Sequence, residues 1–378
     1  MLSRAPAVAA IIVAAAVGGC GGDGGGGPAT TATVGATTRA RPVEVPDPAS
    51  RLTTAQLVGQ RIISGYTGVK PSRSMLRAVR RGTVGGVILF ADNVPSLDRA
   101  RRTSAVLRRE ARRGRQPPLL IMIDQEGGDV NRLAGAPPTA SPTAMGRADG
   151  SGRFARQQGR LTGRALRGVG IDVDLAPVAD VPAFDDSFLG TRAFGRTAAG
   201  VARAACGFAR GLADAGVAPT LKHFPGLGRA AANTDEAAVT IDVTREQLDA
   251  ESLAYRRCAV DVPLTMISSA TYPALDASVP AVLSPATYEL LADTGFRGLT
   301  ISDAFVTPGI VDLRRPALRA LKAGLDLVLY AQDEAAARDA HRRLVSSVRK
   351  GSLSGRRLRA TAARILAFKE WLDRRLPE

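Results

Sequence analysis

The feature that most constrains the fold is a regular alternation of apolar and amphipathic segments that begins near residue 51. Eight short apolar runs, rich in β-branched residues, are each followed by a longer stretch rich in Arg and Ala. The runs lie at residues 61–64, 86–90, 119–124, 173–177, 218–223, 264–268, 299–303 and 325–330. Continuous apolar runs of this length are typical of strands buried on both faces, and therefore of a parallel sheet.

The number and spacing of these runs distinguish between two common parallel architectures, the closed barrel and the open doubly wound sheet. Intervals of roughly 30 to 50 residues leave room for one helix between successive strands. Eight such units favour a closed barrel over an open doubly wound sheet. No Gly-x-Gly-x-x-Gly motif follows the first run, which argues against dinucleotide binding. A last amphipathic helix is expected after Leu353. We therefore predict one α/β domain, a (β/α)₈ TIM barrel over residues 51–378.

The first 50 residues are predicted to contain targeting signals and not to be part of the folded domain. A positive start and an apolar run at residues 5–17, too short to span a bilayer, are typical of a signal peptide. The run ends in Val-Gly-Gly-Cys at Cys20, which resembles a bacterial lipoprotein cleavage box. The resemblance implies a signal peptide at residues 1–19, an acylated Cys20 and an extracytoplasmic, lipid-anchored protein; an ordinary signal peptide with an incidental Cys is the alternative. Residues 20–50, rich in Gly, Thr and Pro, are predicted to form a disordered linker.

The formal net charge of +16 raises the question of nucleic-acid binding. The arginines are scattered as pairs within amphipathic helical segments, as expected of solvated outer faces. No aromatic-interleaved basic groove is present, so no nucleic-acid partner is expected. A basic surface suits an anionic neighbourhood such as cell wall or lipid headgroups.

Histidine and cysteine usage limits the cofactor chemistry. With two histidines and no clustered cysteines, neither a metal site nor another cofactor is expected. His341 lies in an Arg-rich helical segment far from every motif and is predicted to be on the surface. Cys206 and Cys258 lie in predicted helices, where a disulfide and two buried free thiols are both open interpretations. We expect a monomer.

Several of the apolar runs end on a polar or charged residue. These residues are Asp124, His223, Ser268 and Asp303. In a barrel the carboxyl ends of the strands meet on one face, where active sites lie. Two carboxylates and a Lys-His pair at that face predict a polar active site.

Three motifs at these strand ends occur in a recognisable order. They are Ile-Asp-Gln-Glu-Gly-Gly at 123–128 with Val-Asn-Arg at 130–132, Lys-His-Phe-Pro-Gly-Leu-Gly at 222–228, and Ile-Ser-Asp-Ala at 301–304. The ordered set resembles glycoside hydrolase family 3, in particular its β-N-acetylhexosaminidase branch. Segments 85–90, 175–180, 192–195 and 272–276 fit as well, so the resemblance covers residues 52–375.

The resemblance implies roles for individual residues. Asp303 matches the nucleophile, a carboxylate that a strand end holds rigidly at the anomeric carbon. Five further residues match positions that bind sugar hydroxyls: Asp124, Arg132, Arg192, Lys222 and His223. Charged groups of these types form directional bonds to vicinal hydroxyls. The structural alternatives are an ion pair between Lys222 and a carboxylate such as Asp124, and surface positions for Arg132 and Arg192.

The sequence departs from the family at the proton donor. The branch usually has Lys-His-Phe-Pro-Gly-His-Gly, followed seven residues later by the His of an Asp-Ser-His triplet, which serves as general acid/base. Here Leu227 replaces the first His, and the triplet is Asn-Thr-Asp at 233–235. Asp235, or Glu236 beside it, would then be a carboxylic acid/base with a raised pKa.

Two other hypotheses stay open for this altered loop. The barrel could bind glycan without cleaving it, as a lipid-anchored pseudoenzyme, or it could act on another sugar as a β-glucosidase. Because the nucleophile and the sugar-binding positions are retained in type, we adopt the catalytic hypothesis. It predicts a retaining hydrolase of terminal β-linked N-acetylglucosamine in cell-wall-derived glycans, active in peptidoglycan turnover.

Overall fold

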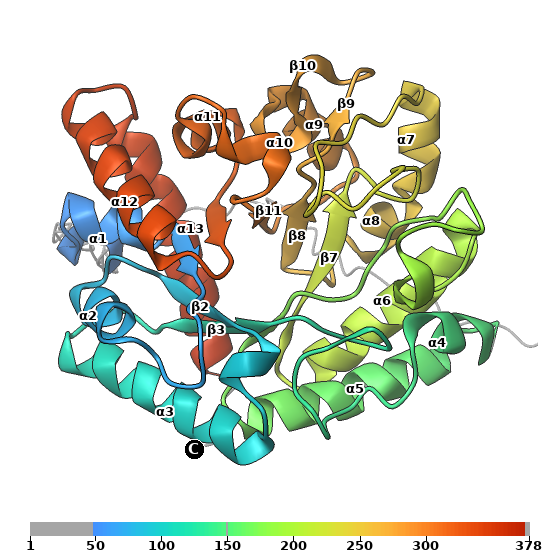
Figure 1. The fold of residues 1–378 in the computed structure, drawn as a ribbon, viewed down its shortest axis with the longest axis horizontal. Coiled ribbons are helices and arrows are strands. Elements are labelled where there is room, and N and C mark those ends of the chain that lie inside the picture. Colours follow the sequence, from blue (N-terminus) through green and yellow to red (C-terminus); the bar gives the residue numbers. More distant parts are fainter. Residues whose placement is uncertain (1–47, 149, 375–378) are drawn as a thin grey trace, which may run out of the picture. The chain divides into compact units, whose positions relative to one another are not determined.

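A computed structural model describes residues 48–148 and 150–374 of the chain (Figure 1). The predicted signal peptide, Cys20 and most of the predicted linker lie outside the described residues. The described part contains a closed barrel of eight parallel strands in the order β1-β12-β11-β8-β7-β6-β3-β2. These strands are β1 Ile62–Ser64, β2 Gly86–Leu89, β3 Leu120–Ile123, β6 Val173–Asp174, β7 Ala218–Phe224, β8 Leu264–Ile267, β11 Leu299–Ala304 and β12 Leu327–Tyr330. Each predicted run overlaps one of them, and the predicted (β/α)₈ architecture is confirmed.

The largest boundary difference is in the fourth run. Strand β6 ends at Asp174, whereas the run was expected to continue to Pro177. Proline has no backbone N–H, so Pro177 cannot donate to a sheet hydrogen bond. The chain rejoins the sheet once more, at an isolated parallel bridge between Val178 and Lys222.

Helices surround the barrel (Figure 1). Their bounds are α1 Thr54–Gly59, α2 Arg73–Arg81, α3 Leu97–Arg113, α4 Pro142–Ala148, α5 Arg153–Gly168, α6 Ala198–Asp214, α7 Arg245–Glu251, α8 Leu253–Cys258, α9 Pro285–Asp293, α10 Pro308–Val311, α11 Pro316–Ala323, α12 Glu334–Arg349 and α13 Gly355–Asp373. Side chains fix several starts, as where Ser72 accepts a hydrogen bond from the Met75 N–H at the start of α2. Two hairpins, β4 Gln125–Gly127 with β5 Val130–Asn131 and β9 Thr271–Tyr272 with β10 Asp276–Pro280, lie in loops.

The apolar side chains form two layers that follow the two-residue period of the strands. Alternate residues of the strands, together with Leu175 just after β6, fill the barrel interior: Ile63, Ile88, Leu120, Met122, Val173, Leu175, Ala218, Leu264, Met266, Leu299, Ile301, Leu327 and Leu329. Their neighbours, such as Ile62, Val87 and Ile121, pack under the helices. Asp124 and Asp303 lie two positions beyond Met122 and Ile301, so the same period directs them into the barrel mouth.

The predicted last helix is α13, and it contributes to the barrel interior. Ile365 and Leu372 belong to the interior cluster, and Phe368 and Trp371 pack against it. Lys369 from the same helix donates hydrogen bonds to Gln60 and to the Gly85 carbonyl, both of which precede barrel strands. Helix α13 therefore closes the amino-terminal end of the barrel.

The two cysteines left open by the sequence form a disulfide, which joins Cys206 of α6 to Cys258 of α8. The prediction for His341 is wrong, because its side chain is only 9% exposed. His341 lies on the face of α12 that also carries buried Ala337 and Leu344, and its Nε2 is 2.8 Å from the Ala55 carbonyl oxygen. The neighbouring Arg342 is exposed, so this Arg-rich helix is amphipathic rather than solvated all round.

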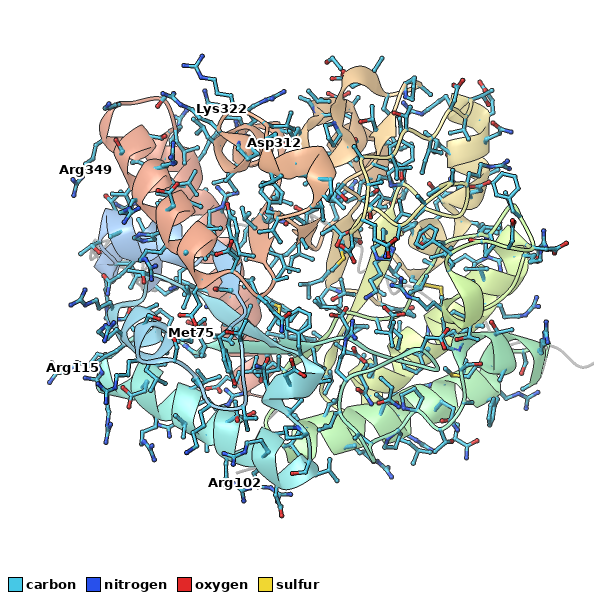
Figure 2. All side chains as sticks on the ribbon, viewed as in Figure 1. Met75, Arg102, Arg115, Asp312, Lys322 and Arg349 are labelled. Atoms are coloured by element: carbon cyan, nitrogen blue, oxygen red, sulfur yellow. A yellow bond between two sulfur atoms is a disulfide. The ribbon has the colours of Figure 1, made fainter. Side chains whose placement is uncertain are left out.

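Many arginines lie on the outside of the helices, as the charge pattern predicts. Figure 2 shows Arg102, Arg115 and Arg349 projecting away from the barrel, and all three are exposed. Among the described residues, no helix is both long and apolar enough to cross a bilayer.

Candidate active site

A cavity of about 430 Å³ lies at the carboxyl ends of the barrel strands. Seven residues singled out from the sequence line it: Asp124, Arg132, Arg192, Lys222, His223, Asp235 and Asp303. They come from loops and strands spread from β3 to β11, and the barrel closure brings them together. Cys20, the predicted lipid attachment site, lies outside the described residues.

One part of the cavity wall is a cluster of charges around Lys222. The Lys222 Nζ lies 2.6 Å from an oxygen of Asp124 and 2.6 Å from an oxygen of Glu126. Burial opposes the charge on Lys222, but the two carboxylates outweigh it and raise the pKa of the ammonium. The ion pair considered from the sequence is therefore present, and Asp124 still lines the cavity.

Glu126 is buried, and two cations form ion pairs with its carboxylate. Arg192 donates to both of its oxygens, at 2.8 and 3.0 Å, in addition to the contact from Lys222. Burial disfavours the carboxylate, yet Lys222 and Arg192 together lower the pKa of Glu126 to about 2. Sequence reasoning did not select Glu126. Its signal was the two-residue spacing from Asp124, which can place two side chains on one side of an extended segment.

The two arginines differ in how much of their hydrogen-bonding capacity is already used. Arg192 is fixed on Glu126, so the surface alternative for it is wrong. The guanidinium carbon of Arg132 lies 5.9 Å from the centre of the Phe90 ring. The buried Arg132 Nε has no hydrogen-bond partner among the described residues. Arg132 therefore lines the cavity with donors that a ligand can use.

His223 is oriented by a buried carboxylate. Its Nδ1 lies 2.8 Å from Asp180, which also accepts hydrogen bonds from the backbone N–H groups of His223 and Leu227. Burial raises the pKa of Asp180, but the His223 ring and these hydrogen bonds outweigh it, so the net shift is downward. With Nδ1 donating to Asp180, Nε2 is the ring nitrogen available to a ligand. Asp180 was part of a quoted motif but was not predicted as a site residue.

Asp303 is fixed on strand β11 at the cavity wall. It is half-buried, and its carboxylate accepts a hydrogen bond of 2.8 Å from the Ala304 N–H. Residues 302–304 adjoin a register shift between β11 and β12. The strand therefore presents this carboxylate from a rigid element, as the prediction for a nucleophile requires.

Asp235 reaches the same cavity from the loop between β7 and α7. The residue is exposed at the rim, and its backbone N–H donates to the Asn233 side chain in a local turn. Loss of hydration and then the negative charge of Asp303 raise the pKa of Asp235. Glu236 is also exposed, but it does not line the cavity. Of the two candidate acids, Asp235 therefore lines the cavity and Glu236 does not.

The altered Lys-His motif changes the cavity wall in one further way. Leu227, which stands where the family usually has His, is buried and lines the cavity with an apolar side chain.

Within residues 48–148 and 150–374, no group of three His, Cys, Asp or Glu side chains is placed to hold a metal ion.

Comparison with known proteins identifies the family of the chain. Residues 51–368 match the family model described as the glycosyl hydrolase family 3 N terminal domain. An uncharacterized secreted glycosyl hydrolase of Arthroderma benhamiae is 32% identical over 342 residues, covering 87% of this chain and 97% of that protein. The beta-hexosaminidase LpqI of Mycobacterium tuberculosis is 31% identical, covering 79% of this chain and 81% of its own length.

Solved structures give the same result. A family 3 beta-N-acetylglucosaminidase from Paenibacillus superposes with a TM-score of 0.81 at 32% identity over 85% of this chain. This chain spans 63% of the length of that enzyme. A beta-N-acetylhexosaminidase from Beutenbergia cavernae has a TM-score of 0.78 at 29% identity, covering 84% of this chain and 99% of its own. The family model matches well over half of the chain, and the chain therefore belongs to glycosyl hydrolase family 3.

Proposed function

We propose that this glycoside hydrolase is a retaining enzyme that releases terminal β-linked N-acetylglucosamine from cell-wall-derived glycans. The observation that carries the proposal is that Asp303 and Asp235, one on a strand and one on a loop, line a single cavity. Retaining glycosidases use two carboxyl groups in this way, one as nucleophile and one as acid/base. The names of the Paenibacillus and Beutenbergia proteins support the choice of sugar.

The buried cluster would bind the terminal sugar. Asp124 accepts hydrogen bonds from sugar hydroxyls, while Lys222 and the free Nε2 of His223 bind neighbouring oxygens. Glu126 fixes Lys222 and Arg192 in place, so these cations do not have to reorganise when substrate binds. Arg132, whose donors are free among the described residues, is available to the sugar or to its substituent.

Chemistry then proceeds in two displacements at the anomeric carbon. Asp303 attacks this carbon and forms a glycosyl ester while Asp235 donates its proton to the departing glycosidic oxygen. In the second step Asp235 removes a proton from water, the water oxygen attacks the anomeric carbon, and the ester bond to Asp303 breaks. Both steps balance, and Asp235 ends protonated as it began.

The electrostatic link between the two carboxyls suits these alternating roles. Asp303 raises the pKa of Asp235 while it is negatively charged, which favours the protonated acid before attack. Esterification removes that charge, so the pKa of Asp235 falls and the residue becomes a base for the incoming water. The charge of Asp303, present before attack and absent in the ester, would therefore let Asp235 act first as an acid and then as a base.

The test is nitrophenol release from the nitrophenyl β-N-acetylglucosaminide and β-glucoside. Asp303→Asn should lower kcat by about 10⁴-fold or more, as expected when a nucleophile is removed. Asp235→Asn should lower kcat by about 10²-fold or more, as is typical of a lost general acid. Glu236→Gln is the matched control, because it changes the adjacent exposed carboxylate that lies outside the cavity, and it should stay near wild type.

Each alternative hypothesis predicts a different result. Absence of turnover on both substrates by the folded wild type would favour the glycan-binding pseudoenzyme. Faster release from the β-glucoside would favour the β-glucosidase. Loss of activity in Glu236→Gln with Asp235→Asn unaffected would move the acid/base to Glu236.

We also propose that the barrel, residues 51–378, is held outside the cytoplasm by a lipid on Cys20 through the linker at residues 20–50, after removal of residues 1–19. Support comes from the lipoprotein-like cleavage box in the sequence. Metabolic labelling with palmitate should mark the wild-type protein and not Cys20→Ala. Equal labelling of both would refute the anchor.

A further inference from the structure

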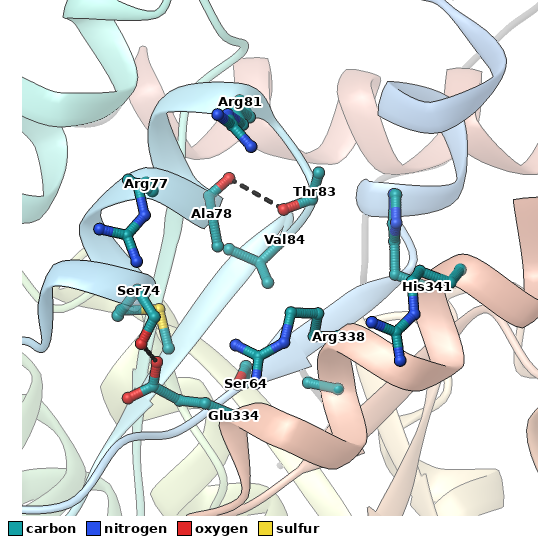
Figure 3. Close-up of a pocket in the computed structure, with 13 residues that line it drawn as sticks. Ser64, Ser74, Arg77, Ala78, Arg81, Thr83, Val84, Glu334, Arg338 and His341 are labelled. Carbon is teal, nitrogen blue, oxygen red and sulfur yellow. Dashed lines mark hydrogen bonds between the residues drawn. The ribbon is translucent and has the colours of Figure 1, made fainter.

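A second cleft lies on the outer wall of the barrel, between α2 and α12 (Figure 3). Its volume is about 270 Å³, and it shares no lining residue with the cavity at the barrel mouth. Helices α2 and α12 follow β1 and β12, which are neighbours in the sheet. The cleft is therefore separate from the proposed catalytic machinery.

Four arginines line this cleft, two from each wall. Arg77 and Arg81 are four residues apart on α2, and Arg338 and Arg342 are four apart on α12. Residues at this spacing lie on one helix face, where like charges repel each other. In Figure 3, Arg77 and Arg81 lie along one wall and Arg338 along the facing wall.

Three of these cations have no partner in the described part of the chain. Arg342 pairs with Asp339 at 2.9 Å, whereas Arg77, Arg81 and Arg338 form no ion pair or hydrogen bond with any described residue. By contrast, Arg80, which directly precedes Arg81 on α2, forms an ion pair with Glu110 of α3. Three arginines without a partner among the described residues thus line the cleft.

One carboxylate lines the cleft, and it is already engaged. Glu334 accepts hydrogen bonds from the hydroxyls of Ser72 and Ser74, at 2.8 and 2.6 Å. These bonds tie Glu334 to the start of α2 rather than to an arginine. The cleft therefore keeps an excess of positive charge.

A buried histidine adds a polar atom to the cleft. His341 is 9% exposed and lines the cleft. Its Nε2 lies 2.8 Å from the Ala55 carbonyl, and since a carbonyl can only accept, Nε2 carries the proton. No described residue bonds to Nδ1. Burial lowers the pKa of His341 despite the Ala55 contact. The charged residues that line the cleft with it are the four arginines and Glu334.

We propose that the cleft between α2 and α12 binds a ligand that carries a phosphate monoester or phosphodiester group. The planar guanidinium forks of Arg77, Arg81 and Arg338 match phosphate oxygens, and His341 lines the same cleft. The shared chemistry has two sources outside the cytoplasm, a phospholipid headgroup and a soluble phosphate or phosphodiester.

The chain has two histidines, which makes His341 a direct probe. Imidazole signals of the purified full chain would be followed by NMR as inorganic phosphate replaces chloride at constant ionic strength, with His223→Gln assigning the other signal. The His341 signal should move saturably, and the His223 signal should not. The double variant R77Q/R338Q should weaken binding by more than about tenfold, because two charge-assisted contacts are lost.

The matched control is R102Q/R109Q, which removes the same charge from exposed arginines on α3. It should bind phosphate as the wild type does, and neither pair should change glycosidase activity. Vesicles of phosphatidylglycerol and of phosphatidylcholine distinguish the sources: retention on the anionic vesicles that is lost in R77Q/R338Q alone indicates a lipid headgroup, and phosphate binding without retention indicates a soluble ligand. An unmoved His341 signal, or equal weakening by both pairs, overturns the proposal.

Discussion

Two buried lysines lie at opposite ends of the same barrel, and their surroundings differ. Lys222 at the mouth and Lys369 at the closed end are each 2% exposed. The Nζ of Lys222 meets two carboxylates at 2.6 Å. The Nζ of Lys369 meets two neutral acceptors, the Gln60 side chain at 2.6 Å and the Gly85 carbonyl at 2.7 Å.

The pKa values of the two lysines shift in opposite directions. Burial lowers the pKa of Lys369 to about 7, with slight opposition from Asp172. Burial acts on Lys222 as well, but its carboxylate partners reverse the net direction. The charge at the mouth is therefore stabilised by partners, as its proposed role in substrate binding requires. The charge at the closed end has only polar contacts and is lost near neutral pH.

Of the two lysines, Lys222 is expected to show the larger effect when it is replaced by Met. This change leaves Asp124 without its cation and Glu126 with Arg192 alone. Removing one partner from a buried ion pair costs about 3–5 kcal/mol, so the free energy of unfolding should fall by that amount. The value of kcat/KM should fall by about 10²-fold or more, because the sugar loses a fixed cation.

Urea unfolding and steady-state kinetics measure both effects, and Lys322→Met is the control. Lys322 is exposed on α11 (Figure 2), so its replacement should change stability by less than about 0.5 kcal/mol. If the two variants unfold at the same urea concentration, the ion pairs of Lys222 contribute nothing and the contrast between the barrel ends disappears.

The sequence predicted the elements whose signal is local. Each barrel strand is a continuous apolar run, and Asp124 and Asp303 follow directly from the two-residue period at a strand end. Glu126 and Asp180 were not selected, because their importance depends on Lys222, Arg192 and His223, which are distant along the chain. His341 was misplaced because its Arg-rich neighbours conceal the apolar face of α12. Glu126 and His341 thus had local signals, the spacing from Asp124 and the apolar face of α12, whereas the role of Asp180 depends on a tertiary contact that no local pattern contains.

A smaller effect, on the rate and its pH profile, is expected at Asp235, a carboxyl at the barrel mouth that lacks the paired cations of Glu126. Partial loss of hydration and the charge of Asp303 raise its pKa, and a general acid works only when protonated. The kcat/KM of the wild type should therefore fall as pH rises through this raised pKa, and Asp235→Asn should lose that alkaline limb along with about 10²-fold of rate. Glu236→Gln should keep the limb. An alkaline limb that persists in Asp235→Asn would assign it to another group.

The smallest effect is expected at the closed end, from Lys369→Met. The folded pKa of Lys369, about 7, lies below the 10.5 of an exposed lysine, so folding releases a proton between these values. The contribution of this group to stability is complete above the unfolded pKa and is lost as pH falls toward 7. The wild type should therefore gain about 1 kcal/mol relative to Lys369→Met between pH 7 and pH 8. Urea unfolding at several pH values measures this difference. If the stability of the two proteins depends on pH in the same way, Lys369 keeps its charge. The buried lysines at the two ends of the barrel would then both be charged at neutral pH.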